Sequence, residues 1–169
     1  FTIIADIGQW SRDHPPDVPF FVPTGAQISM QTYRRGLLVV DGHHNRLLWV
    51  SVEGQISELV GFQNTVPTGT DIWGGTIYVA QAGPVPHDPA DGKVLALERN
   101  SSTPTEIASG LRLLIDVEFH PGRSPYVLSH GTWNGAFEGS PALPNTGALA
   151  RVNDDGTFTV LVSNLNQPS

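Results

Sequence analysis

The chain has 169 residues, with 9 Lys and Arg against 16 Asp and Glu, which gives a formal charge of −7. Nucleic-acid affinity rests on basic side chains that neutralise phosphates, so this balance argues against DNA or RNA as a partner. No stretch approaches the ~20 consecutive apolar residues that cross a bilayer, and we expect no membrane partner. Hydrophobic residues make up 39% of the chain and 18 Gly and 14 Pro are spread along it, a composition typical of many short strands joined by turns.

The sequence contains no cysteine, which excludes disulfides and thiolate metal sites without settling the compartment. It begins FTIIADIG, with neither an initiator Met nor a signal peptide, and we expect it to be a piece of a longer protein. Asn100 starts an Asn-Ser-Ser glycosylation sequon in a polar stretch, which favours a secreted or extracytoplasmic location.

Internal repetition is the most informative feature of the sequence. VPTGAQIS begins at Val22 and VPTGTDIW begins at Val66, 44 residues later, while LLIDVEFH from Leu113 is a divergent third copy. A period of ~40–50 residues is typical of the blades of a β-propeller.

In chain order, residues 1–8 resemble the strands that end the later repeats, and we predict them to be the last strand of a preceding blade. Each repeat then predicts four strands rich in β-branched and aromatic residues and separated by turn residues. Each repeat opens with a first strand, and Thr24 and Thr68 belong to the loops that enter two of these strands. The second, third and fourth strands are predicted over residues 36–42, 46–52 and 55–61, then 75–83, 93–98 and 103–109, then 124–131, 147–153 and 157–163.

The predicted fold is therefore all-β, a partial β-propeller of about three four-stranded antiparallel blades spanning the whole chain, residues 1–169. The blades cover residues 22–62, 66–109 and 111–163, and residues 164–169 start the next blade. A propeller closes with ~4–8 blades, so we expect half of a six-bladed propeller. The missing half would come from the same longer chain, from another chain or from a second copy. The alternative is a compact sandwich.

Blade topology places the loops that enter the first strand and the loops that join the second strand to the third on one face. We predict that this face binds a small-molecule or protein ligand. The candidate ligand-binding residues are Asp41, His43, Thr68, Gln81, Trp133 and Asn134. For Asp41 the alternative is a structural one, in which Asp41 and Asn45 cap a tight turn.

His130 and Trp133 lie together in the longest of these loops. An imidazole beside an aromatic surface can act as a general acid or base or can hold a sugar ring, so His130 is a candidate catalytic residue. The alternative is that Trp133 packs the loop onto the blade and that His130 bonds to the backbone.

Asp71 and Asp116 are predicted on the innermost strands of successive blades, and they are candidate metal ligands. Carboxylate oxygens suit Ca²⁺, and the sequence leaves the identity of any cofactor otherwise unknown. Alternatively, each carboxylate accepts hydrogen bonds from neighbouring backbone groups. Asp41, His43, His44 and Asn45 could likewise supply oxygen and imidazole ligands for a divalent cation.

Residues 41–55, DGHHNRLLWVSVEGQ, resemble the Asp-x-x-x-Asn-x-Leu/Ile stretch of NHL-type and SMP-30-like propellers. The order VPTG, IYVAQAG, VLALE, IASGLRLLIDVEF and YVLSHG, which spans nearly the whole chain, resembles the ScyD/ScyE-like family most closely. This resemblance implies a six-bladed propeller of secreted or extracytoplasmic type with no general chemistry. SMP-30-like enzymes, in addition, hold a metal in the channel.

A second, local resemblance concerns SHGTWNG, residues 129–135, which is similar to the His-Gly-Ser-Trp-Asn-Arg stretch of sorbosone and glucose dehydrogenase-like quinoprotein propellers. Gly135 stands where those proteins have arginine, which weakens the case for an anionic quinone cofactor. We therefore expect a binding propeller of uncharacterised activity. The alternative is an enzyme, either a metal-dependent lactonase-like hydrolase or a quinoprotein sugar dehydrogenase-like oxidoreductase.

Overall fold

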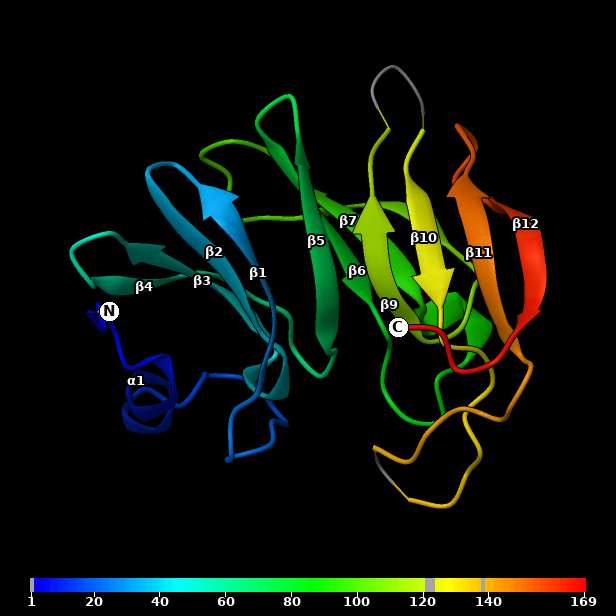
Figure 1. Cartoon of the computed structure of the whole chain (residues 1–169), viewed down its shortest axis with the longest axis horizontal. Helices are drawn as coiled ribbons and strands as arrows, with labels where there is room; N and C mark the ends of the chain where they lie inside the picture. Colours follow the sequence, from blue (N-terminus) through cyan, green and yellow to red (C-terminus); the bar gives the residue numbers. More distant parts are fainter. Residues whose placement is uncertain (1, 121–123, 138) are drawn as a thin grey trace. The chain divides into compact units, whose positions relative to one another are not determined.

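The computed structural model describes residues 2–120, 124–137 and 139–169. Within them the chain forms twelve strands, one short α-helix and two 3₁₀ turns (Figure 1). It divides into two compact units, Phe1–Pro67 (unit 1) and Thr68–Ser169 (unit 2). The prediction of an all-β chain built from four-stranded antiparallel sheets is confirmed.

Unit 1 contains one antiparallel sheet whose strands follow one another in chain order. The strands are β1 (Gln27–Tyr33), β2 (Gly36–Asp41), β3 (Arg46–Ser51) and β4 (Ile56–Gly61). The 3₁₀ turn η1 (Gly42–His44) joins β2 to β3. The two central strands are almost entirely buried, because apolar residues run through both faces of β2 and β3.

The strand predicted over residues 1–8 is not found among residues 2–8, and this prediction is wrong. Residues 2–6 are irregular, and Ile7 begins helix α1 (Ile7–Asp13), whose first turn is capped by the Asp6 carboxylate accepting from the Gln9 N–H at 2.8 Å. Ala5, Ile7 and Trp10 pack against a buried cluster of the sheet. Helix α1 thus packs its apolar residues Ile7 and Trp10 on the sheet, whereas Ile3 and Ile4 before it are exposed.

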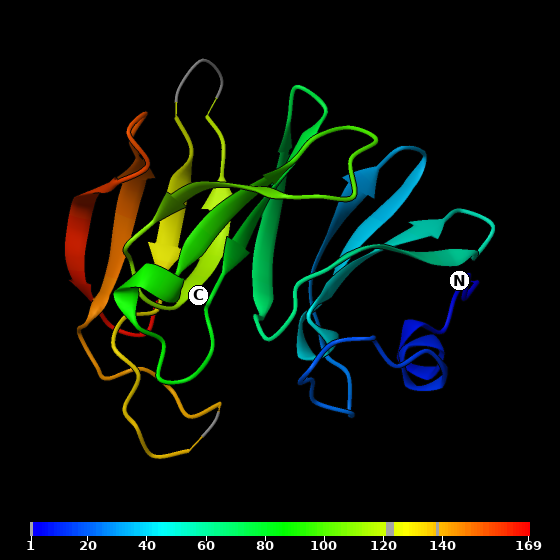
Figure 2. The same cartoon turned by 180° about the vertical axis from the view of Figure 1, so that it is seen from behind.

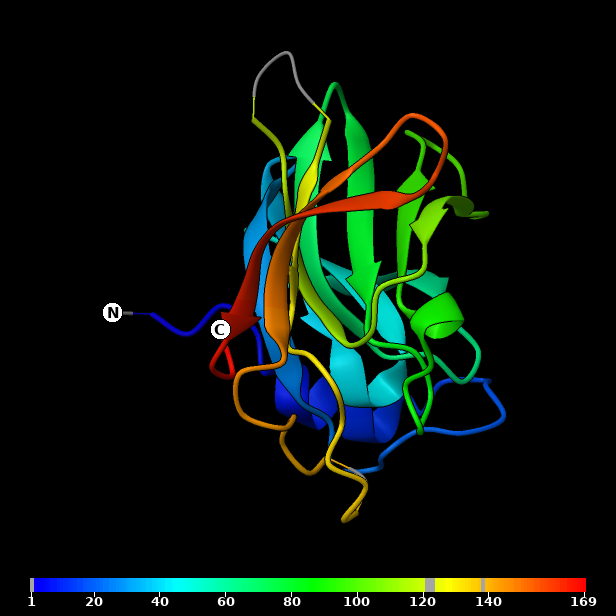
Figure 3. The ribbon, with the colours of Figure 1, turned by 90° about the vertical axis from the view of Figure 1, so that its right-hand side faces the viewer.

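Unit 2 contains the other two sheets. The first consists of β5 (Pro67–Trp73), β6 (Thr76–Gln81), β7 (Lys93–Leu97) and β8 (Thr105–Ser109). The second consists of β9 (Leu114–Glu118), β10 (Tyr126–Ser129), β11 (Gly147–Val152) and β12 (Phe158–Leu165). The 3₁₀ turn η2 (Pro89–Asp91) lies in the loop between β6 and β7. Figure 2 shows β7 and β8 from behind, and Figure 3 turns β11 and β12 toward the viewer.

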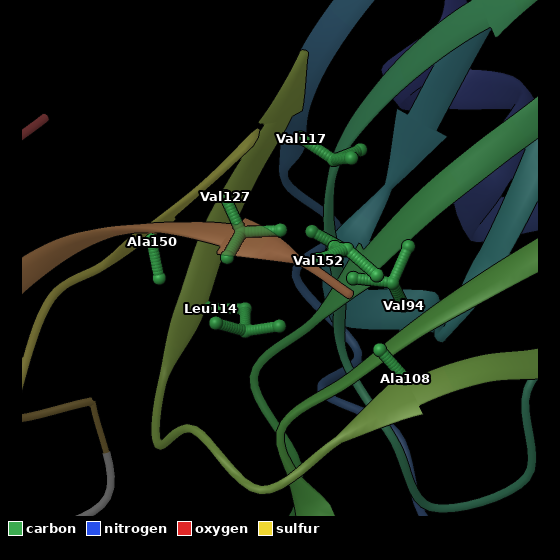
Figure 4. Packing of buried hydrophobic residues seen from close by; sticks show 8 residues of the cluster. Val94, Ala108, Leu114, Val117, Val127, Ala150 and Val152 are labelled. Carbon is green, nitrogen blue, oxygen red and sulfur yellow. The ribbon is translucent and has the colours of Figure 1, made fainter. Parts of the chain in front are cut away.

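One apolar core joins the two sheets of unit 2 (Figure 4). It consists of fully or almost fully buried residues from both sheets: Ala80, Val94, Ala108, Leu114, Val117, Val127, Ala150 and Val152. Small and β-branched side chains dominate the cluster, so the two sheets face each other closely.

The three sheets share a register feature in their outermost strands. In each sheet, a β-bulge leaves one extra residue of the fourth strand between the partners of two adjacent third-strand residues. These third-strand pairs are Leu47 and Leu48, Val94 and Leu95, and Leu149 and Ala150. Such bulges increase local twist and bend an edge strand. Their recurrence indicates that the sequence repeat is also a structural repeat.

The first strand of the first repeat starts at Gln27, so Thr24 precedes it in the entering segment, as predicted. The pairing of β1 with β2 ends at Gln27 and Asp41, and η1 follows directly after Asp41. Residues 20–26 therefore have no strand to pair with, and they run over η1 instead. Among the described residues, no helix is both long and apolar enough to span a membrane.

Candidate functional site

In unit 1, Asp41 ends β2 and is completely buried. Its Oδ1 accepts from Gln27 Nε2 at 2.9 Å, and its Oδ2 accepts from Ser11 Oγ at 2.8 Å and Arg46 Nε at 2.9 Å. His44 Nδ1 lies 3.1 Å from the same Oδ2. A ligand would have to displace these contacts to reach Asp41, so the geometry favours a structural role. The capping alternative does not hold for Asp41, whose side chain makes no cap hydrogen bond.

Arg46 is the cationic partner of Asp41 and is 1% exposed. Its Nη1 donates to the His14 carbonyl at 2.8 Å and to Glu58 Oε2 at 3.1 Å, and its guanidinium lies 5.0 Å from the centre of the Trp10 ring. Since His14 and Trp10 belong to the α1 region, this buried ion pair also fastens the helix to the sheet.

The neighbouring residues of the turn differ in their accessibility. His43 is half-buried, and its Nδ1 lies 3.2 Å from Thr24 Oγ1. Asn45 is buried in the left-handed conformation, and its Nδ2 donates to the carbonyls of Phe20 and Gln63. Asp41 and His43 are the two predicted ligand-binding residues in this region. Of these two, His43 is the one that solvent can reach.

In unit 2, Thr68 and Gln81 are both buried. Thr68 lies inside β5 rather than in a loop, with its hydroxyl 2.8 Å from the Leu114 carbonyl and 3.1 Å from the Ala80 carbonyl, so it links the two sheets. Gln81 is the last residue of β6 and is 4% exposed. These positions give both residues little access to a ligand.

Two long loops of unit 2, residues 82–92 and the described residues of 130–146 (130–137 and 139–146), lie at the lower end of that unit in Figure 1. The rings of His87 and Trp133 meet edge-to-face, with centroids 6.0 Å apart and planes at 83°. His87 Nδ1 lies 3.2 Å from the Ala82 carbonyl. Because a carbonyl only accepts, Nδ1 carries the proton, and Nε2 of a neutral ring is left as an acceptor.

Hydrogen bonds within the second loop hold Trp133 and Asn134 in place. Trp133 Nε1 donates to Ser140 Oγ at 2.7 Å, and Ser140 Oγ in turn donates to Asn134 Oδ1 at 2.6 Å. Trp133 also forms an isolated bridge with Ala142. The structure thus brings these two predicted residues together and fixes the indole.

His130 is anchored by its backbone, whose N–H donates to the Leu113 carbonyl at 2.9 Å. Its side chain is half-buried and makes no hydrogen bond within the described part of the chain. The catalytic role of His130 therefore stays a prediction.

Apolar side chains are exposed on both loops. Phe137 is 67% exposed, and Val85 and Leu143 are also exposed. Together with His87 and Trp133 they define the loop surface of unit 2. Sequence reasoning missed His87, although its loop occupies the same place in its repeat as the Trp133 loop does in the next.

The predicted metal ligands Asp71 and Asp116 lie on β5 and β9, the first strands of their sheets. Asp71 accepts from the N–H groups of Ile72 and Phe119, both at 2.7 Å, as the backbone-bonding alternative predicts. A Cβ added at Gly69 would meet Asp116, so the Asp116 side chain lies directly against the β5 backbone.

Burial raises the pKa of Asp116; the Val117 N–H lowers it, and the charge of Asp71 raises it. Glu118 joins these two carboxylates: burial raises its pKa, and the charges of Asp71 and Asp116 add to the effect. The described residues nevertheless include no group of three or more His, Cys, Asp or Glu placed to hold a metal ion. Ca²⁺ binding therefore stays a prediction.

No protein-family model matches the chain, and no curated protein matches its sequence.

Proposed function

We propose that the chain is a non-catalytic, ligand-binding module of the β-propeller type, and that it binds a neutral ligand through the loop surface of unit 2. The propeller is supported by three sheets of four consecutive strands with the same bulge in each outer strand. It is also supported by the face-to-face core that joins two successive sheets.

The observation that carries the binding proposal is the contact between His87 and Trp133 from two separate loops. It places two aromatic rings beside exposed apolar side chains, a combination that suits the apolar face of a sugar ring or of a short peptide. Neither loop contains Lys or Arg, so an anionic ligand would find no cation on these loops.

Saturation-transfer NMR with a panel of neutral mono- and disaccharides tests the proposal. We expect transfer to the ring protons of at least one sugar, and we expect both Trp133→Ala and Phe137→Ala to abolish it. Trp73→Phe is the matched control, because Trp73 is an exposed tryptophan of unit 2 that stacks on Phe119, outside the loop surface.

The same measurement with short apolar peptides separates the two kinds of ligand. Transfer to a peptide alone, lost in the same two variants, would assign a protein ligand to this surface. If neither panel showed transfer, or if Trp133→Ala kept it, the binding proposal would be overturned.

A metal-dependent hydrolase is the second candidate. The charge of Asp71 raises the pKa values of Asp116 and Glu118, but the described residues include no group of three placed to hold a metal ion, so any cation would be held by fewer ligands of this chain. A bound Ca²⁺ would relieve this repulsion and stabilise the folded state by mass action. Under this candidate, millimolar Ca²⁺ raises the melting temperature of the wild type and leaves Asp116→Asn unchanged. An unaltered wild-type melting temperature would rule it out.

We further propose that other blades complete the propeller, supplied by a longer chain, by another chain or by a second copy. The exposed apolar residues Val160, Leu161 and Val162 of the edge strand β12 support a missing neighbour. Native mass spectrometry tests this proposal, because a stable, soluble 18.2 kDa monomer would contradict it. A secreted or extracytoplasmic location is part of the same proposal.

A further inference from the structure

The turn between β7 and β8 in unit 2 carries a motif that the loop surface does not use. Asn100, Ser101 and Ser102 form the only Asn-X-Ser/Thr sequence in the chain, and Thr103 rather than proline follows it. This sequence is the acceptor motif of N-linked glycosylation, which modifies the asparagine amide. Residues 98–104, which connect the two strands, are all exposed or half-buried. The motif therefore lies where a modifying enzyme and a bulky glycan have room.

The backbone holds Asn100 in a tight and accessible turn. The Ser101 N–H donates to the Glu98 carbonyl at 2.9 Å, which closes a β-turn with Asn100 as its third residue. Asn100 has a φ of +69°, a conformation that glycine and asparagine adopt more readily than other residues. The turn thus explains an asparagine or a glycine at this position, and it leaves the residue exposed.

The two serines of the motif differ in what their hydroxyl groups do. Ser101 Oγ accepts from the Thr103 N–H and donates to the Thr103 carbonyl, both at 3.0 Å. Ser102 is exposed, and its hydroxyl makes no hydrogen bond within the described part of the chain. The turn therefore uses Ser101 for its own structure. The hydroxyl of Ser102, which is the one that the motif requires, is left for a transferase to recognise.

Asn100 lies at the other end of its sheet from the loop surface. The loop of residues 82–92, which carries His87, leads into β7 at Lys93, and the turn leaves β7 after Leu97. A strand advances about 3.3 Å per residue, so β7 separates these two connections by roughly 13 Å. A glycan on Asn100 would therefore leave the loop surface accessible.

We propose that Asn100 is a site of N-linked glycosylation. The donor is an oligosaccharide joined through its anomeric carbon to a polyprenyl diphosphate. Asn100 Nδ2 forms a bond to the anomeric carbon and gives up one proton, while the bond from that carbon to the diphosphate oxygen breaks and the diphosphate carrier leaves. No group is oxidised or reduced. This inference rests on the secreted or extracytoplasmic location proposed above and not on ligand binding.

Production of the whole chain behind a heterologous signal peptide in cultured eukaryotic cells, followed by intact-mass spectrometry, tests this proposal. We expect most of the recovered chain to exceed 18.2 kDa by the mass of one N-linked glycan. Peptide-N-glycosidase in heavy-oxygen water should remove this glycan and leave a labelled aspartate at position 100. Recovered chain with an unmodified Asn100 would overturn the proposal, and it would count against the site rather than the location, because the added signal peptide directs secretion.

Three variants assign the modification to the motif. Asn100→Gly removes the acceptor amide and keeps the positive φ, and Ser102→Ala removes the required hydroxyl, so we expect both to lose the added mass. Ser101→Ala is the matched control, because it removes the neighbouring hydroxyl but preserves the motif as Asn-Ala-Ser, and it should keep the glycan. Persistence of the glycan in Asn100→Gly or Ser102→Ala would contradict the assignment.

Saturation transfer to the same sugar panel, measured before and after enzymatic removal of the glycan, separates this inference from the binding proposal. We expect equal transfer in the two forms, because the glycan lies at the opposite end of the sheet. Transfer that appears only after removal would contradict the placement of Asn100 away from the loop surface. Absence of transfer in both forms would overturn the binding proposal, whereas the mass of the glycosylated chain would still support the site.

Discussion

The turn after β2 in unit 1 and the loops after β6 and β10 in unit 2 occupy the same place in the repeat, yet they have opposite environments. The turn encloses an ion pair between Asp41 and Arg46 beneath a covering segment. The loops are longer and expose aromatic and apolar side chains, including Phe137. Position in a repeat thus predicts which end of the sheet a residue lies at, but local length and charge decide whether that residue is structural or accessible.

The largest effect is expected from removing the buried anion of the closed turn. Asp41→Ala leaves the Arg46 guanidinium buried without its main partner, which should lower the free energy of unfolding by about 3–5 kcal/mol. Urea denaturation measures this loss. Glu58→Gln is the control, because its carboxylate is 42% exposed and its loss should cost less than about 1 kcal/mol. Equal losses in the two variants would contradict a structural role for Asp41.

A smaller loss is expected from filling the close approach between β5 and β9. In Gly69→Ala the new Cβ would collide with the Asp116 side chain and backbone, and we expect a loss of about 1–3 kcal/mol through overpacking. Thermal denaturation measures it. Gly8→Ala serves as a control, since that position in α1 has no atom within 3.5 Å of the added Cβ. A neutral Gly69→Ala would show that the two strands are not in close contact.

The carboxylates of unit 2 predict a pH dependence with a defined sign. Burial raises the pKa values of Asp116 and Glu118 above the ordinary 3.8 and 4.5. The folded state therefore binds the carboxyl protons of Asp116 and Glu118 more tightly than the unfolded state does. Above the raised pKa values both groups are ionised, and their ionisation then lowers the free energy of unfolding by its full amount. Lowering the pH from neutrality toward those ordinary values should relieve this cost.

Asp116→Asn should thus stabilise the protein at pH 7 by less than about 1 kcal/mol, because solvent screens a half-buried carboxylate. The gain over the wild type should shrink as the pH approaches the ordinary value. Melting curves of both proteins between pH 7 and 4.5 provide the comparison. A gain that grows on acidification would refute the assigned sign.

The smallest effect is expected at the hairpin between β1 and β2. Arg34 and Arg35 both have positive φ there, whereas the equivalent hairpin of unit 2 uses Gly74 and Gly75. Arg35→Gly should relieve the backbone strain of a positive φ in the folded state. Glycine also raises the conformational entropy of the unfolded chain, which offsets part of this gain, so we expect a net stabilisation of about 0.5 kcal/mol. Chemical denaturation measures the difference, and destabilisation would show that Arg35 makes a compensating contact.

The strands were predictable from the sequence because alternation, β-branched residues and turn residues are local signals. All twelve predicted repeat strands appear, with shifted ends, whereas the strand predicted over residues 1–8 does not. FTIIADIG has the composition of a strand, but a strand needs a pairing partner, and Asp6 offers a helix cap instead.

The candidate site was less predictable. The sequence indicated Trp133 and Asn134 correctly as loop residues, but it could not show that Asp41 and Thr68 are buried, since burial depends on contacts with Ser11 and Leu114 far along the chain. His87 carried no sequence signal beyond its place in the repeat. Its contact with Trp133 arises only when the two loops meet in space.

Labelling of the native protein with diethyl pyrocarbonate at pH 7, read by mass spectrometry, tests the contrast between closed turn and open loops most directly. The chain carries six histidines as internal probes. We expect His43, His87 and His130 to be modified while His44 stays unmodified until the protein unfolds. Modification of His44 as fast as that of His130 would contradict the account.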